Sequence, residues 1–378
     1  MHILLVSHSS DLMGAELSVL PVVSEAVGNR GHRVTVTVPG EGPLTPRLAA
    51  AGADVEVLPT KLWMGRRFNP VVGSVRLLQA ALSAPGYERY VSRLRPDLVV
   101  TNSAVIPAGA VAARRAGIPH VWVVHETLLT NPSLRSALPK RTLTRMIDDL
   151  SASIVAVSDL VAEQVLSLTP GAAAKMTVIP PAIPARPLAP PPPAERAGLT
   201  RLLLLGRLSE EKGQRDAVEA LAICARAGHE LHLRFAGISD PAAQETLRAL
   251  ARTLGVGDLI DILGWTDSAD ALYAWTDATL MLSRNEAFGR VTVESLMSGR
   301  PVVGYRAGTT PQLLADGGGL LVEPGVESLA RALSDLAAAP PAFARLRAEA
   351  VERARHLNGA PSSEKRLVDH LETVRAEG

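Results

Sequence analysis

Short apolar runs recur along the chain, with helical patterns between them. The first series comprises His2–Ser7, Val34–Val38, Val55–Leu58, Leu98–Thr101, His120–Val124, Ile154–Val157 and Met176–Ile179. A second series comprises Arg201–Leu205, Leu231–Ala236, Leu259–Leu263, Ala278–Leu282, Pro301–Gly304 and Gly319–Val322. Alternation of strand and helix is typical of parallel, doubly wound sheets. The chain is therefore predicted to be α/β, with two Rossmann-like domains of similar size.

A proline-rich stretch separates the two series. Pro180–Pro193 holds eight prolines in fourteen residues, which indicates a stiff, extended linker because proline interrupts helices and central strands. We expect a first domain over residues 1–180, a linker over 181–199 and a second domain over 200–361. The last segment, 362–378, is expected to form a helix that packs back on the first domain.

Composition narrows the class of protein. With 39 basic and 38 acidic residues the net charge is +1, which argues against a dedicated nucleic-acid binder. The one cysteine, Cys224, lies in a helical pattern and fits a core position in a reducing, cytoplasmic setting. The first residues, MHILLVSHSS, lack a basic n-region and predict a first strand rather than a signal peptide.

Two glutamates bracket a Phe-Gly step in the segment SRNEAFGRVTVESLMSGRPVVG. Glu286 and Glu294 have seven residues between them. A buried strand is predicted before them, and a helix is predicted over Thr292–Ser298. The acids therefore belong to the carboxyl end of a strand, where open α/β sheets bind their ligands.

The start of this helix favours a phosphate. The amides of Phe288, Gly289 and Arg290 would be unpaired there, and Gly289 lets the backbone approach closely. An anion beside two carboxylates is consistent if the acids hold neutral hydroxyls. A phosphate-linked polyol, that is a nucleotide sugar, meets both conditions. The alternative is two solvated acids on a helix face.

The start of the second domain supplies positive charge. The segment LLLLGRLSEEKGQ places Gly206, Arg207 and Lys212 directly after a buried strand. Two cations at that edge can neutralise a diphosphate and stabilise the charge that builds as it departs. The alternative is a surface pair between Lys212 and Glu210 or Glu211.

The first domain offers two weaker signals. Gly14 lies in the loop after the first strand and Glu16 at a helix start, but the G-x-G-x-x-G fingerprint is missing, which disfavours a nicotinamide oxidoreductase. His125 and Glu126 end a buried strand. No second histidine follows at the helical offset of a zinc protease. Capping of local backbone is the alternative role for His125.

Taken together, these residues resemble retaining glycosyltransferases of family 4, which have the GT-B architecture of two Rossmann-like domains facing a cleft. The resemblance covers nearly the whole chain. It is strongest in the Arg207 and Lys212 segment, in the spaced acids Glu286 and Glu294, and in GTTPQLLADGGGLLVEPG from residue 308 onward.

The resemblance implies a role for each candidate residue. Glu294 would bind the ribose and Glu286 the hydroxyls of the donor sugar. Arg207 and Lys212 would bind the phosphates, and His125 would lie near the reacting sugar. His125, Arg207, Lys212 and Glu286 are the expected catalytic residues, and the expected donor-binding residues are Gly14, Gly206, Trp265 beside Gly264, Ala287, Phe288, Gly289, Arg290 and Glu294.

Three positions depart from the common family pattern. Met13 and Gly14 stand where a glycine pair is frequent, which puts a phosphate contact there in doubt. Gln312 replaces a frequent glutamate, which blurs the choice of donor. Arg290 stands where leucine is frequent. It could contact the diphosphate or a carboxylated donor, or it could lie at the surface.

The resemblance also implies a reaction. A hexose would pass from a UDP-, GDP-, ADP- or TDP-linked sugar to a hydroxyl acceptor with retention of configuration, and neither acid would be a nucleophile. No cofactor is expected beyond the nucleotide sugar as co-substrate. No metal is expected either, because the chain has no D-x-D. A nucleotide-sugar epimerase of the same architecture and a non-catalytic nucleotide-sugar-binding protein remain alternatives.

The acceptor is the least determined part of this prediction. Two basic stretches in the first domain, KLWMGRRF and RSALPKRTLTR, could hold an anionic acceptor or rest on the inner face of a membrane. Solvated helix faces explain them equally well. A monomer and a homodimer are both compatible with the sequence. The residues concerned are Lys61, Trp63, Arg66, Arg67, Phe68, Arg135, Lys140, Arg141 and Arg145.

Overall fold

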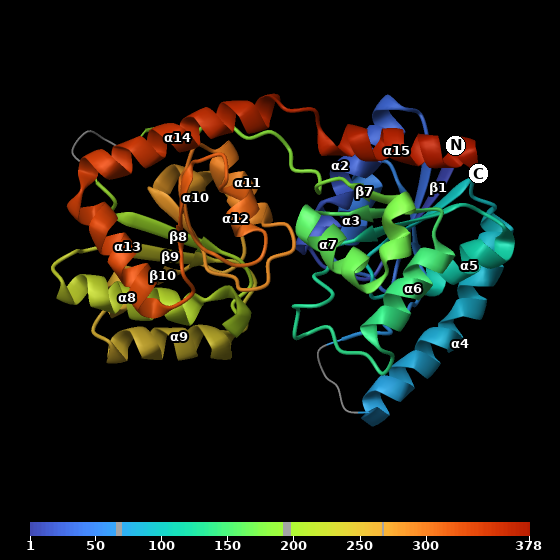
Figure 1. Cartoon of the computed structure of the whole chain (residues 1–378), viewed down its shortest axis with the longest axis horizontal. Helices are drawn as coiled ribbons and strands as arrows, with labels where there is room; N and C mark the ends of the chain where they lie inside the picture. The colour runs from blue at the N-terminus through green and yellow to red at the C-terminus, as the bar shows by residue number, and fades with distance from the viewer. Residues whose placement is uncertain (66–69, 192–197, 267) are drawn as a thin grey trace. The chain divides into compact units, whose positions relative to one another are not determined.

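The protein folds into two compact units, each built around one parallel sheet (Figure 1). The structure is a computed structural model and describes residues 1–65, 70–191, 198–266 and 268–378. Unit 1 comprises Met1–Pro184 and Pro361–Gly378, and unit 2 comprises Ala185–Ala360. Residues 185–191 of the expected linker therefore belong to unit 2, where the Ala189 amide donates to the Ser298 carbonyl (3.0 Å).

The sheet of unit 1 has seven strands in the order β3-β2-β1-β4-β5-β6-β7. The strands are β1 His2–Ser7, β2 Arg33–Val38, β3 Asp54–Val57, β4 Leu98–Asn102, β5 His120–Val124, β6 Ser153–Ala156 and β7 Met176–Val178. The helices around it are α1 Gly14–Leu17, α2 Val19–Ser24, a π-helical turn Glu25–Asn29, α3 Leu44–Ala50, α4 Pro70–Leu94, α5 Ala108–Ala116, α6 Lys140–Leu150, α7 Asp159–Leu168, a 3₁₀ turn Pro170–Lys175 and α15 Ser363–Glu377.

The sheet of unit 2 has six strands in the order β10-β9-β8-β11-β12-β13. The strands are β8 Arg201–Leu205, β9 His232–Ala236, β10 Ile260–Ile262, β11 Ala278–Met281, β12 Val302–Tyr305 and β13 Gly319–Val322. The helices are the 3₁₀ turns Glu210–Lys212 and Gly257–Leu259, and α8 Gln214–Arg226, α9 Pro241–Thr253, α10 Asp270–Trp275, α11 Arg290–Met297, α12 Thr310–Leu313, α13 Val326–Ala338 and α14 Pro340–Gly359.

The central strands of each sheet are covered on both faces, which explains why they appear in the sequence as continuous apolar runs. In β11, Leu280 packs into the cluster that includes residues of α8 and α13, while its neighbour Met281 packs into the cluster that includes residues of α11 and α14. In unit 1 all five residues of β4 and of β5 are buried. The predicted strands are therefore confirmed, each within one residue of its expected ends.

The C-terminal helix α15 packs on unit 1, as the sequence predicts. Val368 and Leu371 on its inner face are buried. The Arg30 guanidinium contacts Asp369 and lies 3.2 Å from the Glu372 carboxylate. The His370 ring lies 2.8 Å from the Ser153 hydroxyl at the start of β6. Apolar burial and these polar contacts together hold the last segment of the chain on the first unit.

Each sheet has a switch point, where the chain reverses the direction in which strands are added. In unit 1 the switch point lies between β1 and β4, and in unit 2 it lies between β8 and β11. Ligands of open α/β sheets bind at the carboxyl ends of the strands that flank this point. The loops that follow β1, β4, β8 and β11 are therefore where a site is expected.

Candidate functional site

The switch point of unit 2 brings together two of the predicted donor segments. Lys212 follows β8 and Glu286 follows β11, and their Nζ and Oε2 atoms lie 2.7 Å apart. Both side chains keep some exposure, 33% and 18%. A surface pair with Glu210 or Glu211 does not account for this placement. Arg207 is exposed in the same loop as Lys212.

The loop that carries Glu286 is held by the segment after β12. Gly308 has φ of +56°, and a Cβ there would lie 2.6 Å from the backbone nitrogen and oxygen of Glu286. The amide of Thr309 donates to the Glu286 carbonyl (3.0 Å). Only glycine fits this close approach, so the Gly-Thr-Thr-Pro segment acts by shaping the loop beneath Glu286.

The helix α11 begins at the same edge of the sheet. Gly289 precedes it with φ of +82° and ψ of +46°, and Arg290 is the first helical residue, two residues before the predicted start. The carboxyl end of β11 and the amino end of α11 are thus joined by Ala287, Phe288 and Gly289. The helix dipole makes such an end favourable for a phosphate.

Glu294 lies one turn into α11 and is buried among three partners. Its Oε1 lies 2.8 Å from Nε of Arg290 and 3.4 Å from a guanidinium nitrogen of Arg186, and the Tyr273 hydroxyl donates to Oε2 (3.2 Å). Burial, followed by the nearby carboxylate, holds the pKa of Tyr273 well above its usual range, so the phenol stays a donor. Sequence analysis missed Arg186 and Tyr273, because neither has a spacing pattern that points to Glu294.

The loops after β8, β9 and β10 are tied to one another. The Gly206 amide donates to the Ala236 carbonyl (2.9 Å), and the Gly237 amide donates to the Gly264 carbonyl (2.7 Å). A Cβ on Gly237 would lie 2.2 Å from the Gly206 oxygen, so glycine is required. Trp265, next along the chain, is 45% exposed and free to cover a planar group.

In unit 1, hydrogen bonds connect the predicted histidine, His125, through Asn102 to the start of α1 on the other side of the switch point. The Nε2 atom of His125, after β5, lies 2.8 Å from Oδ1 of Asn102 at the end of β4. The Asn102 amide donates in turn to the Ala15 carbonyl (3.1 Å), beside Gly14 at the start of α1. A Cβ on Gly14 would meet nothing within 4 Å, so the space beside it is open.

The electrostatic state of His125 follows from its surroundings. With Asn102, Ser18 and apolar strand residues it lines a pocket beneath α15. Burial, and secondarily His8, lowers the pKa of His125 to about 3. The ring is therefore neutral near pH 7, and it can exchange hydrogen bonds without carrying charge.

Glu126 fixes the backbone around His125. Its Oε2 accepts from the amides of His125 and Ala104, both at 3.0 Å, and its Oε1 accepts from the Ser103 hydroxyl. The carboxylate thus joins the ends of β4 and β5. Ser103 has φ of +154°, a strained value for a residue with a side chain, at the point where this network forms.

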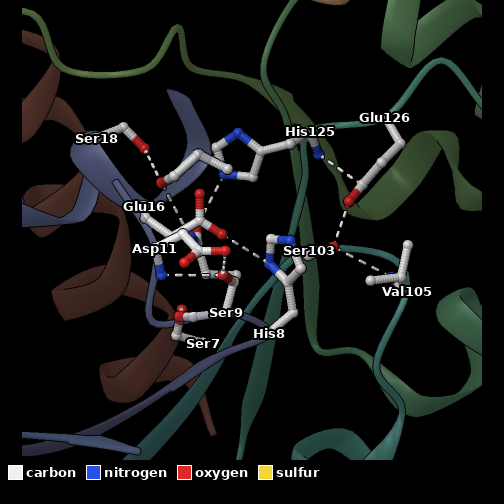
Figure 2. A network of polar contacts seen from close by, with 12 residues as sticks. Ser7, His8, Ser9, Asp11, Glu16, Ser18, Ser103, Val105, His125 and Glu126 are labelled. Atoms are coloured by element: carbon white, nitrogen blue, oxygen red, sulfur yellow. Dashed lines mark hydrogen bonds and ion pairs between the residues drawn. The ribbon is translucent and has the colours of Figure 1, made fainter. Parts of the chain in front are cut away.

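Three carboxylates approach the switch point of unit 1, and we call them the acidic cluster: Asp11, Glu16 and Glu126. Figure 2 shows the Asp11 and Glu16 carboxylates beside each other, with His8 reaching toward Glu16; the His8 Nδ1 and Glu16 Oε1 atoms are 3.2 Å apart. Burial raises the pKa of Glu16, and His8 opposes that shift. The sequence placed Glu16 at a helix start but gave it no role.

The two basic stretches of unit 1 meet at one point, where the backbones of Gly65 and Arg135 form an isolated antiparallel bridge. Trp63, from the first stretch, is buried, stacks on Trp122 (ring centroids 5.9 Å apart) and donates from Nε1 to the Ala104 carbonyl (2.6 Å). The suggestion that it contacts a ligand or membrane is therefore wrong. Arg141 and Arg145 are exposed on α6, and Lys140 donates to the Leu129 carbonyl (3.3 Å). The remaining basic residues are Lys61 and Arg135, both exposed, whereas Arg66, Arg67 and Phe68 lie outside the described residues.

Within the described ranges, no three histidine, cysteine, aspartate or glutamate side chains come together as metal ligands would. None of the helices in the described part of the chain has the length and apolar character needed to span a bilayer.

Comparisons with known proteins agree with this geometry. The family model for glycosyltransferase family 4 matches residues 14–186, and that for glycosyl transferases group 1 matches residues 189–357. A 2-deoxystreptamine glucosyltransferase of Streptomyces kanamyceticus is 30% identical over 355 residues, covering 85% of this chain and 89% of that protein. A D-inositol 3-phosphate glycosyltransferase of Acidothermus cellulolyticus is 31% identical over 241 residues, covering 57% and 53%.

A solved structure shares the fold. Anabaena Alr3699/HepE, in complex with UDP, superposes with a TM-score of 0.79 at 22% identity, covering 99% of this chain and all of that one. Two Rossmann-type sheets, the match of each unit to a family model and a relative that covers 85% of the chain lead to one conclusion. The chain belongs to family 4 of the group 1 glycosyltransferases and has the GT-B fold.

Proposed function

We propose that this enzyme transfers a hexose from a nucleoside-diphosphate sugar to a hydroxyl of its acceptor, with retention of configuration and without a metal ion. The observation that carries the proposal is the pairing of Lys212 with Glu286 beside the amino end of α11, at the switch point of unit 2. UDP-glucose is the first donor to test, because structures of Anabaena Alr3699/HepE contain UDP and UDP-glucose.

Binding of the donor would exchange partners within this site. Lys212 and Arg207 would turn to the diphosphate together with the amides at the start of α11. Glu286, released from Lys212, would accept hydrogen bonds from the hydroxyls of the sugar. Glu294 would hold the ribose, with Arg186, Arg290 and Tyr273 keeping its carboxylate in place, and the base would lie toward Trp265.

The chemical step needs charge stabilisation at the diphosphate. The bond from the anomeric carbon to the diphosphate oxygen breaks, and the acceptor oxygen bonds to that carbon on the same face. The acceptor proton passes to the departing phosphate oxygen, so the diphosphate leaves with it. Lys212 and Arg207 stabilise the developing negative charge. His125, neutral near pH 7, serves as a hydrogen-bonding group beside the sugar rather than as an acid.

The acceptor class suggested by the relatives is a cyclitol. One relative is named for 2-deoxystreptamine, which carries amines, and another for D-inositol 3-phosphate, which carries an anion. Both acceptors are small polyhydroxylated rings. We therefore propose a polyhydroxylated ring of this kind as the acceptor of unit 1.

The test is release of nucleoside diphosphate from UDP-, GDP-, ADP- and TDP-glucose with a panel of cyclitols, with and without EDTA. We expect transfer from one donor class with the same anomeric configuration in the product. Epimerised sugar in the absence of an acceptor would instead establish an epimerase. Donor that binds without ever being consumed would indicate a binding protein. Activity that EDTA abolishes would overturn metal independence.

A further inference from the structure

At the switch point of unit 1, the residues of the acidic cluster and the neighbouring His8 differ in how far they are buried. Asp11 is exposed, His8 is 25% exposed in its side chain, and Glu16 behind them is fully buried. Asp11 is held by Ser9, whose hydroxyl lies 3.3 Å from the Asp11 carboxylate and 3.0 Å from its amide. A ligand at this edge of the sheet would meet Asp11 and His8 first.

The buried carboxylate of Glu16 is the feature that indicates a ligand. Neither of its carboxylate oxygens has a hydrogen-bond donor from another residue in the described chain, although both are buried. The charged groups acting on it most strongly are His8, which stabilises its charge, and Glu126 and Asp11, which oppose it. A buried carboxylate with one partial partner and two acidic neighbours is costly, and a nearby cation would relieve that cost.

Within the described residues, the segments that carry this cluster provide no permanent cation. Residues 8–16, 102–105 and 125–127 contain no lysine or arginine. A phosphorylated or carboxylated acceptor would be repelled here, whereas an ammonium group would be attracted.

We propose that the acidic cluster is an acceptor subsite that selects a polyhydroxylated ring bearing an ammonium group. Asp11 contacts the ammonium group, and His8, oriented by Glu16, hydrogen-bonds a neighbouring ring hydroxyl. His125, on the other side of the cluster, is uncharged and does not repel the cation. This inference rests on the proposed glycosyl transfer and assigns the charge of its acceptor.

The test compares three cyclitols that differ in charge. Binding of 2-deoxystreptamine, myo-inositol and D-inositol 3-phosphate to the full chain is measured by calorimetry in the presence of UDP. We expect 2-deoxystreptamine to bind at least about tenfold more tightly than myo-inositol, and D-inositol 3-phosphate to bind most weakly. Added salt should weaken the binding of 2-deoxystreptamine and leave that of myo-inositol unchanged.

Two variants separate the exposed and buried acids. Asp11→Asn, at an exposed position, should weaken 2-deoxystreptamine binding about tenfold and leave myo-inositol binding unchanged. Glu16→Gln, of the same shape, should weaken both ligands, because His8 would lose its orienting charge. Glu163→Gln is the matched control: Glu163 is an exposed acid on α7. It should change nothing.

The possible failures are distinguishable. Tighter binding of myo-inositol or D-inositol 3-phosphate, or a preference for 2-deoxystreptamine that survives Asp11→Asn, would overturn the acceptor inference. UDP binding is recorded in the same experiment and tests the proposed function separately. A chain that binds 2-deoxystreptamine but not UDP would retain the cationic subsite and refute the nucleotide-sugar site.

Discussion

The two switch points differ in how their carboxylates are partnered. In unit 2, Glu286 pairs with Lys212 at 2.7 Å, and Glu294 has Arg290 and Tyr273 within hydrogen-bond distance. In unit 1, Glu16 forms an ion pair with His8 at 3.2 Å, and among the described residues neither of its oxygens accepts a hydrogen bond from another residue. Unit 2 partners its carboxylates with its own charges, whereas the negative charge of Glu16 in unit 1 is partnered only by His8 among the described residues.

Lys212→Met should have the largest effect on turnover. The variant keeps the length of the side chain but removes the charge that would stabilise the departing diphosphate. We expect kcat to fall by about 10²–10³-fold, the range found when one preorganised donor is removed. Steady-state release of nucleoside diphosphate measures the loss. Lys365→Met, at an exposed position on α15, is the control and should be neutral.

A small effect of Lys212→Met would contradict the role given to the paired charges of unit 2. If kcat fell less than about fivefold, the paired charges of unit 2 would not serve the leaving group. Recovery of part of the activity by Lys212→Arg would show that positive charge at this position, rather than packing, is what the reaction requires.

Glu286→Gln should have the next largest effect, again on turnover. The amide keeps the shape of the side chain but accepts hydrogen bonds less strongly, so the donor sugar would be less well positioned. We expect kcat to fall about 10–10²-fold with a smaller change in the KM for the donor. Full turnover by this variant would refute the assignment of Glu286 to the sugar.

The fold could be predicted from the sequence more fully than the site. Central strands such as β4, β5 and β11 are buried on both faces, so each appears in the sequence as a continuous apolar run that can be recognised without long-range information. The residues after these strands were therefore placed at the correct edge of the sheet. Glycines such as Gly308 were visible in the sequence, but the backbone that each one accommodates was not.

The contacts missed by sequence analysis depend on distant parts of the chain. Arg186 lies in a proline-rich stretch, and its approach to Glu294, 108 residues further on, follows from the packing of that stretch on unit 2. Trp63 was misassigned because the basic residues near it suggested a surface, whereas stacking on Trp122 draws it into the core. Local pattern carries no information about either event.

Glu294→Gln should act on binding rather than on turnover. Glu294 is buried between Arg290 and Tyr273 and is proposed to hold the ribose. Loss of one charge-assisted hydrogen bond should raise the KM for the donor about tenfold, with kcat changed less than about twofold. Arg186→Gln should move the KM in the same direction by a smaller factor, because Arg186 only steadies the carboxylate. A drop in kcat alone would place Glu294 in the chemical step instead.

The smallest effect concerns the protonation of His125 in unit 1. Burial lowers its pKa in the folded protein to about 3, below its usual value of 6.5. As pH falls below about 6.5, the unfolded chain therefore binds a proton that the folded chain refuses. The stability that the neutral ring contributes is complete above pH 6.5 and is lost progressively between pH 6.5 and 3. The free energy of unfolding falls over this range by no more than about 1.4 kcal/mol per pH unit.

NMR of histidine-labelled protein measures this directly, with His125→Gln identifying the signal. The His125 resonance should stay constant from pH 8 to about pH 5, a range over which an ordinary histidine titrates. Urea unfolding of the same two proteins should converge in stability as pH falls through that range. A midpoint near 6.5 would mean that His125 is charged below neutral pH; it would then repel an ammonium group, and the contrast between a charge-paired unit 2 and an anionic unit 1 would no longer hold.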